Sequence, residues 1–168
     1  RQMCIRDSPC DMTEAYLKNA LEQGVNRISV GVQTNRDELL VKIGRRHTAA
    51  EAEKAVNRAF KLGFRNISID LMCELPGQTV DDFEKTLKYA VHLPVTHMSV
   101  YSLILEEGTR FSQMASRGIL ARPSENDSWA MYQAMCRILP HYGFERYEIS
   151  SFARTGFQSV SYTHLRAH

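Results

Sequence analysis

The chain has 168 residues, of which 43% are hydrophobic and 24% are charged, and its formal net charge is +2 at pH 7. This is an ordinary globular composition, and the length is sufficient for one domain with a substantial core. The nearly neutral charge gives no reason to expect a nucleic-acid or anionic-membrane partner. Because no apolar run approaches the roughly 18 residues of a membrane span, and no charged-then-apolar leader is present, we expect a cytoplasmic protein.

The two ends of the sequence match no helix or strand pattern joined to the segments that they flank. The first residues read RQMCIRDS and the last read VSYTHLRAH, and both strings resemble translated sequencing-adapter read-through. We therefore expect a partial core domain over residues 8–159, with residues 1–7 and 160–168 foreign to the natural protein. The natural protein would then be longer at both ends.

The first half of the chain alternates between helical and strand patterns. A helix is predicted over residues 11–23, opened by a capping box of Asp11 and Glu14. A strand is predicted over residues 26–33, because apolar residues alternate there with small or polar ones. A short helical turn follows over residues 36–43.

The clearest helical pattern begins at Thr48, which forms a capping box with Glu51, and ends at Gly63. Its predicted buried stripe has the spacing of an amphipathic helix and consists of Ala52, Ala55, Val56, Ala59 and Phe60. A second alternating strand follows over residues 66–71, and then a tight loop over residues 74–79.

The second half repeats the alternation. Thr79 and Asp82 are expected to open a helix, and a third strand follows over residues 97–102. After an irregular segment, a last long helix is predicted to begin at Ser124 and to stop or bend at Pro140. Tyr132, Met135, Cys136 and Leu139 are expected on one side of that helix. A fourth strand is then predicted over 146–150.

Helices between the strands predict a parallel sheet with right-handed crossovers. Parallel strands that are covered on both faces usually read as continuous apolar runs, but these strands alternate. One face is apolar, and the other carries Ser29, Gly31, Gln33, Ser68, Asp70, Ser99 and Tyr101. We therefore predict an α/β fold that forms a sector of a barrel, with helices on the outer face and a polar ligand on the concave side.

Candidate ligand-binding residues lie near the carboxyl ends of these strands, where parallel α/β folds bind ligands. Asp70 either accepts hydrogen bonds from ligand hydroxyl or ammonium groups or forms a salt bridge with an arginine such as Arg45, because a buried carboxylate needs a partner. Gln33 closes its strand and either binds a ligand through its amide or ties down a loop. His47 is interpreted as a loop histidine with local hydrogen bonds, and His97 as structural.

Two further features have competing interpretations. The helix start at Thr79 either holds an anion on its free N–H groups or only turns the chain, and we favour the turn. The four cysteines, Cys4, Cys10, Cys73 and Cys136, have none of the spacings of zinc or iron–sulfur sites. We expect no metal site within this sequence, and we expect Cys73 and Cys136 to be reduced, buried thiols.

Five segments carry a resemblance to a known family. They are GVNRISVGVQT, LLVKIGRRH, GFRNISIDLMCELPGQT, HMSVYSLILEEGT and YEISSFARTG, in this order between about Pro9 and Ser159. They resemble the radical S-adenosylmethionine superfamily, and within it the group of oxygen-independent coproporphyrinogen III oxidases and haem chaperones. The resemblance implies a sector of a (β/α)6 partial TIM barrel, a [4Fe-4S] cluster, and S-adenosylmethionine bound across the barrel mouth.

Carried over position by position, the family's contacts to S-adenosylmethionine fall on Gln33 in GVQ, Arg45 in GRRH, Asp70 in SIDL and Ile104 in YSLI. Ile104 would contribute a backbone or apolar contact. The resemblance implies that Arg45 faces the methionine carboxylate and that Asp70 accepts from hydroxyl or ammonium groups. No residue is assigned as catalytic.

The sequence also departs from the family pattern. The C-x3-C-x2-C motif that ligates the cluster belongs upstream of this fragment, and the histidine–asparagine segment expected after FARTG is replaced. The family glutamate that contacts the cofactor falls at Arg6, Thr34 stands in place of the usual serine, and Glu74 in place of the usual glycine. These departures imply that the chain as given binds neither cluster nor cofactor tightly.

Three functions stay open. GRRH, LPGQT, LEEGT and YEISSFA are similar to the haem chaperone branch, which binds haem and transfers it to an acceptor protein. The alternative is an oxidase that decarboxylates coproporphyrinogen III. The third possibility is that this 168-residue chain has no activity alone.

Overall fold

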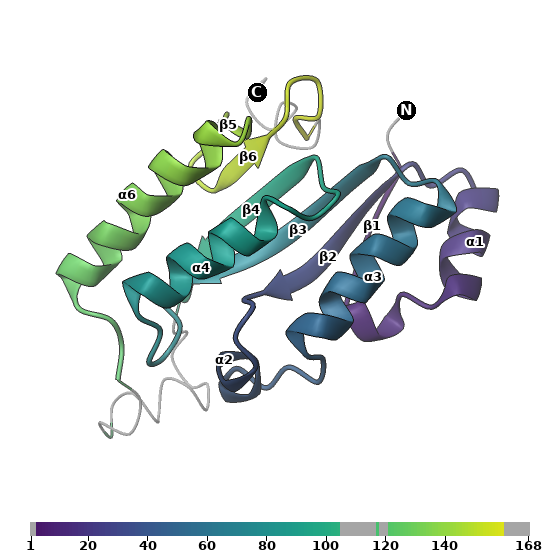
Figure 1. Cartoon of the computed structure of the whole chain (residues 1–168). Coiled ribbons are helices and arrows are strands. Elements are labelled where there is room, and N and C mark those ends of the chain that lie inside the picture. Colours follow the sequence, from purple (N-terminus) through teal and green to yellow (C-terminus); the bar gives the residue numbers. More distant parts are fainter. Residues whose placement is uncertain (1–2, 105–116, 118–120, 160–168) are drawn as a thin grey trace, which may run out of the picture.

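The structure, a computed structural model, describes residues 3–104, 117 and 121–159. Figure 1 shows a twisted sheet with helices α3, α4 and α6 on one side of it. The elements are β1 (Cys4–Asp7), a 3-10 turn η1 (Pro9–Asp11), α1 (Glu14–Glu22), β2 (Arg27–Gln33), α2 (Asp37–Lys42), α3 (Ala49–Leu62), β3 (Asn66–Cys73), α4 (Val80–Ala90), β4 (His97–Ser102), α6 (Glu125–His141), β5 (Glu145–Arg146) and β6 (Ser151–Ala153).

The six strands form one sheet in the order β1-β2-β3-β4-β6-β5. Strands β1 to β4 are parallel, and for β2, β3 and β4 this confirms the prediction from the helices between them. The prediction of a fourth strand over residues 146–150 is wrong. The chain instead makes a hairpin, in which β5 ends at Arg146 and β6 returns antiparallel between β5 and β4. The reversal leaves Ile149 at the turn, with 77% of its surface exposed.

The first described residues form a strand, contrary to the expectation that they match no strand pattern. Residues Cys4–Asp7 pair in parallel with β2, so the free edge of β2 supplies the backbone partners that the local sequence did not indicate. Strand formation depends on such tertiary context more than on intrinsic propensity. Whether these residues belong to the natural protein stays a prediction.

Capping side chains set the helix starts by local hydrogen bonds. Thr48, Thr79 and Ser124 each form the predicted capping box with the acidic residue three positions later. The predicted start of the first helix at Asp11 is wrong. The helix begins at Glu14 and is capped by Thr13, whose hydroxyl accepts from the Tyr16 N–H at 3.2 Å. At the other end of the chain, α6 stops one residue after Pro140, as predicted.

The core lies between the apolar face of the sheet and the helices. Strand residues such as Ile28, Ile67 and Met98 are fully buried there, together with Phe83 of α4. The predicted stripe on α3 is buried except for Phe60, which is 41% exposed and lies under the guanidinium of Arg65. On α6, the expected stripe is similarly incomplete, because Tyr132 is 36% exposed and Cys136 is only half-buried.

Candidate functional site

The polar face of the sheet is built by the register of the parallel strands. Gly31 of β2, Asp70 of β3 and Ser99 of β4 are neighbours, and Ser29 and Ser68 form the next row. The side chains of the three serines and of Asp70 are buried, so each polar group needs a hydrogen-bond partner or a ligand.

Asp70 is the only carboxylate among the buried residues of the described chain, with 2% of its surface exposed. Its Oδ2 accepts from the Ser29 hydroxyl at 3.2 Å and pairs with Arg6 Nε at 3.0 Å. Burial raises the pKa of Asp70, and Arg6, Ser29 and Ser99 oppose that shift. The salt-bridge interpretation therefore describes this structure, but the cation is Arg6 and not Arg45.

Gln33 ends β2 with a left-handed backbone, at a φ of 69°, and its side chain is buried. Its amide folds back toward Gly31, because a Cβ built at Gly31 would lie 2.9 Å from Gln33 Nε2. No hydrogen bond reaches this amide from any described residue. Among the described residues, the amide therefore ties down no loop, and it lies beside the backbone of Gly31, which carries no side chain.

The other two predicted contacts to S-adenosylmethionine, Arg45 and Ile104, lie apart from Gln33 and Asp70. Arg45 follows α2 and is exposed, and its backbone N–H donates to the Leu40 carbonyl at 2.9 Å. Ile104 follows β4 and is 81% exposed. Within the described residues, no hydrogen bond or ion pair joins either side chain to Gln33 or Asp70.

Two histidines flank the polar face. His97 contacts the Ser68 hydroxyl through Nδ1 at 2.8 Å and the Tyr147 hydroxyl through Nε2 at 2.7 Å. Burial, reinforced by the charge of Arg27, lowers the pKa of His97 to about 3, so it is neutral and structural as predicted. His47 is also buried, with Nε2 3.4 Å from the Val32 carbonyl, and burial lowers its pKa.

Arg27 is a feature that sequence reasoning missed. It opens β2 with only 4% of its surface exposed, and its Nη1 atom has no partner among the described residues. The signal in the sequence was its place in the alternation, two positions before Ser29, which puts it on the polar face. The polar face thus carries two arginines, Arg6 and Arg27, against one carboxylate.

The cysteines do not converge on a cluster site. Cys4 and Cys10 are exposed, Cys136 is half-buried, and Cys73 is buried, as expected, with a pKa that burial raises. In the part of the chain that the structure describes, no group of three His, Cys, Asp or Glu side chains is placed to hold a metal. The described residues therefore do not fit a [4Fe-4S] cluster.

The loop after β3 departs from the resemblance at one backbone position. Glu74 adopts a φ of 60°, in the left-handed region that favours glycine, which is the residue usual in the family at this position. The Thr79 N–H donates to Asp82 Oδ2 at 3.1 Å, and the Asp82 N–H donates to the Thr79 hydroxyl at 3.1 Å. The helix start is therefore capped by its own side chains, which supports the interpretation that this loop only turns the chain.

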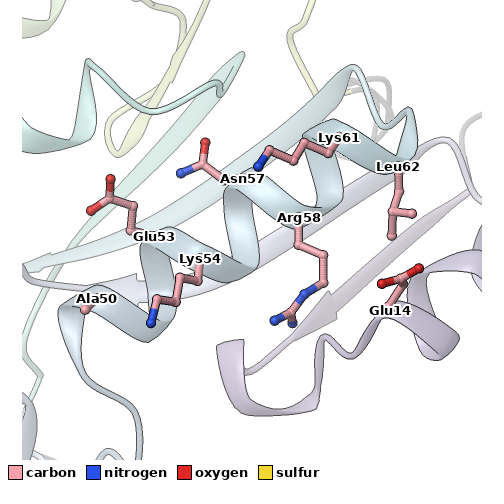
Figure 2. Close-up of a pocket in the computed structure, with 8 residues that line it drawn as sticks. All are labelled: Glu14, Ala50, Glu53, Lys54, Asn57, Arg58, Lys61 and Leu62. Carbon is pink, nitrogen blue, oxygen red and sulfur yellow. The ribbon is translucent and has the colours of Figure 1, made fainter.

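Two grooves on the surface of the described residues lie away from the polar face of the sheet. Figure 2 shows the first, about 750 Å³, along the outer surface of α3, with Glu53, Lys54, Arg58 and Lys61 beside Glu14 of α1. Its charges are mixed, and Arg58 is held by the Met12 carbonyl at 2.6 Å. The second, about 740 Å³, lies between the end of β3 and the first turns of α6.

The fold and the sequence place this chain in a family. Residues 2–90 match the Radical SAM superfamily, and this match covers more than half of the chain. The chain therefore belongs to the radical SAM superfamily, as the resemblance predicted. Membership of this superfamily implies S-adenosylmethionine and an iron–sulfur cluster as the group's cofactors.

Several curated relatives share one name. The chain is 40% identical over 158 residues to Heme chaperone HemW of Lactococcus lactis and to that of Bacillus subtilis, over 94% of its own length. It is 32% identical over 157 residues to Heme chaperone HemW of Haemophilus influenzae. The chain spans only 42% of the length of the first two relatives.

Among solved structures, coproporphyrinogen III oxidase (HemN) from Escherichia coli superimposes with a TM-score of 0.81. The superposition covers 98% of this chain and 38% of that chain, at 23% sequence identity. At that identity the likeness concerns the fold alone, and it confirms the predicted barrel sector. Among the described helices, none is both long enough and apolar enough to cross a membrane.

Proposed function

We propose that this chain is part of the core of a haem chaperone of the radical SAM superfamily, which binds haem and passes it to an acceptor protein in the cytoplasm. The observation that carries the proposal is the 40% identity to two haem chaperones over 158 residues. That stretch covers nearly the whole described chain, including the strands that form the polar face.

We further propose that S-adenosylmethionine would bind along the polar face, with Gln33 and Asp70 as its polar contacts and Arg45 and Ile104 at the rim. The free amide of Gln33 beside Gly31 supports this site. The ion pair of Arg6 with Asp70 weakens it, because that carboxylate already has partners. When bound, S-adenosylmethionine would supply the radical chemistry of such a protein. The role of Gln33 and Asp70 is to bind and orient the ligand.

Haem binding tests the main proposal directly. The purified 168-residue chain would be titrated with haemin, and the Soret absorbance followed. Saturable binding at a one-to-one ratio is the expected result, and no saturable binding by this chain or by the natural, longer protein would refute the proposal. Conversion of coproporphyrinogen III by the natural, longer protein would instead favour the oxidase.

The cofactor contact has a test of its own. Gly31→Ala places a methyl group 2.9 Å from Gln33 Nε2 and so displaces that amide. Equilibrium dialysis with S-adenosylmethionine should then show weaker binding than for the unchanged chain. Gly156→Ala is the control for backbone strain without displacement of the amide, because a Cβ there meets no atom within 4 Å but the residue has a φ of 85°, which alanine adopts at a cost. Equal affinities for all three proteins would remove Gln33 from the site.

A further inference from the structure

We propose that the groove between the end of β3 and the start of α6, called here the α6 groove, is the surface on which the flat face of a haem porphyrin docks. This inference rests on the haem chaperone function proposed above. The groove measures about 740 Å³, within the ordinary range of small-molecule sites. Its lining includes Glu74, Arg122, Pro123, Ser128, Trp129 and Tyr132.

An aromatic pair forms one wall of the α6 groove. Trp129 and Tyr132 are three residues apart on α6, so they lie on the same side of the helix. Their ring centroids are 5.5 Å apart with an interplanar angle of 18°, which is a stacked arrangement. The pair remains open to solvent, because Trp129 is 59% exposed and Tyr132 is 36% exposed.

The core does not account for this aromatic pair. The buried side of α6 consists of Met131, Ala134, Met135, Ile138 and Leu139. Trp129 and Tyr132 lie off that side, and the exposure of Trp129 leaves a large apolar surface without a partner in the described chain. A planar macrocycle can cover such a surface by stacking, which aromatic side chains favour beyond the area that they bury.

Two exposed arginines stand beside the aromatic pair. Arg146 donates from Nη1 to the Tyr132 hydroxyl at 2.6 Å, and its Cζ lies 5.3 Å from the centre of the Tyr132 ring. Among the described residues, Arg122 forms one long ion pair, 3.7 Å from its Nη2 to Glu74 Oε2. Guanidinium groups bind carboxylates through two parallel hydrogen bonds, and haem carries two carboxylates on one edge. Because Glu74 and Glu125 also line the groove, a haem would turn its carboxylates toward Arg122 and Arg146.

The position of the α6 groove agrees with ligand placement in parallel sheets. Glu74 follows directly after β3, the strand that carries Asp70. The groove therefore opens at the carboxyl end of the sheet, where α/β folds bind their ligands. The groove along α3, in contrast, has no exposed aromatic ring in its lining.

The test compares haemin affinities of single variants of the full chain. Trp129 is the one tryptophan of the sequence. Trp129→Ala should weaken haemin binding about three- to tenfold, whereas Trp129→Phe, which keeps a ring, should retain most of the affinity. Arg122→Ala should weaken binding and make it less sensitive to salt.

Tyr142→Ala is the matched control, because Tyr142 is a 39% exposed aromatic residue at the opposite end of α6. The haemin affinity of this variant should stay within about twofold of that of the unchanged chain, a smaller change than the one expected on removing a stacked ring. Circular dichroism would confirm that each variant is folded. If the unchanged chain binds haemin and Trp129→Ala binds it equally well, the α6 groove is refuted and the haem chaperone proposal stands. If the unchanged chain binds no haemin, the α6 groove is refuted, and the haem chaperone proposal is refuted as well if the natural, longer protein also binds none.

Discussion

The two faces of the sheet differ in how their side chains are satisfied. On the helix-covered face, residues such as Ile69 and Val100 pack against α4 and α6, and the buried side chains of the strands there are apolar. On the other face, Arg27 is buried without a partner for its Nη1 atom, and Asp70 depends on Arg6, a residue of the strand at the sheet edge. The helix-covered face therefore explains the stability of the fold, whereas the polar face carries the groups that suit a ligand.

The largest effect is expected from removing volume on the helix-covered face. Ile69→Ala should lower the free energy of unfolding by about 2–5 kcal/mol, because Ile69 is fully buried and its neighbours relax only partly into the space. Urea denaturation followed by circular dichroism measures this change. Ile149→Ala, at a 77% exposed position, should stay within about 0.5 kcal/mol. Similar losses for the two variants would contradict the assignment of the core.

A substitution on the polar face should act in the opposite direction. Arg27→Met removes a buried charge and keeps an apolar side chain of similar length, so we expect a gain of about 1–4 kcal/mol in the free energy of unfolding. The measurement is again urea denaturation. Arg137→Met is the control, since its side chain is 67% exposed and its pair with Glu84 contributes little. A clear loss of stability in Arg27→Met would show that the guanidinium has a partner in solution.

The pH dependence of stability should distinguish Asp70 from exposed carboxylates. Burial raises its pKa in the folded state above the ordinary value of 3.8, so the folded chain binds this proton more tightly than the unfolded chain. Its contribution to stability should therefore fall as the pH rises through 3.8 toward the raised value. Comparing the unchanged chain with Asp70→Asn between pH 3 and 7 isolates this slope. A difference that grows with pH in favour of the unchanged chain would show that Arg6 outweighs burial.

The smallest effect concerns the left-handed residue after β3. Glu74→Gly relieves a backbone conformation that costs a non-glycine residue about 1–2 kcal/mol. It also removes the hydrogen bond from the Ser102 hydroxyl at 3.0 Å and the contact with Arg122. We therefore expect a net gain of less than about 1 kcal/mol in thermal unfolding experiments. Glu145→Gly, in β5 where φ is not positive, should lose stability, and an equal gain there would contradict the backbone explanation.

The local sequence determined where most of the helices begin, and it determined that the sheet has one apolar face and one polar face. Thr48, Thr79 and Ser124 open helices through side chains that reach a backbone N–H three residues away, so a short window contains the whole interaction. Alternation with a period of two likewise predicted that Asp70 and Gly31 share a face, because side chains of a strand point to opposite faces in turn.

Tertiary structure alone decided which strands pair and which charges meet. Cys4–Asp7 became a strand because β2 offered a free edge, and Ser151–Ala153 turned back against β4 instead of running parallel to it. The same pairing brought Arg6 to Asp70 across 64 positions of sequence (70 − 6). The α6 groove likewise joins the end of β3 to α6. Contacts between residues this far apart follow from strand register and packing, which no local pattern of residues encodes.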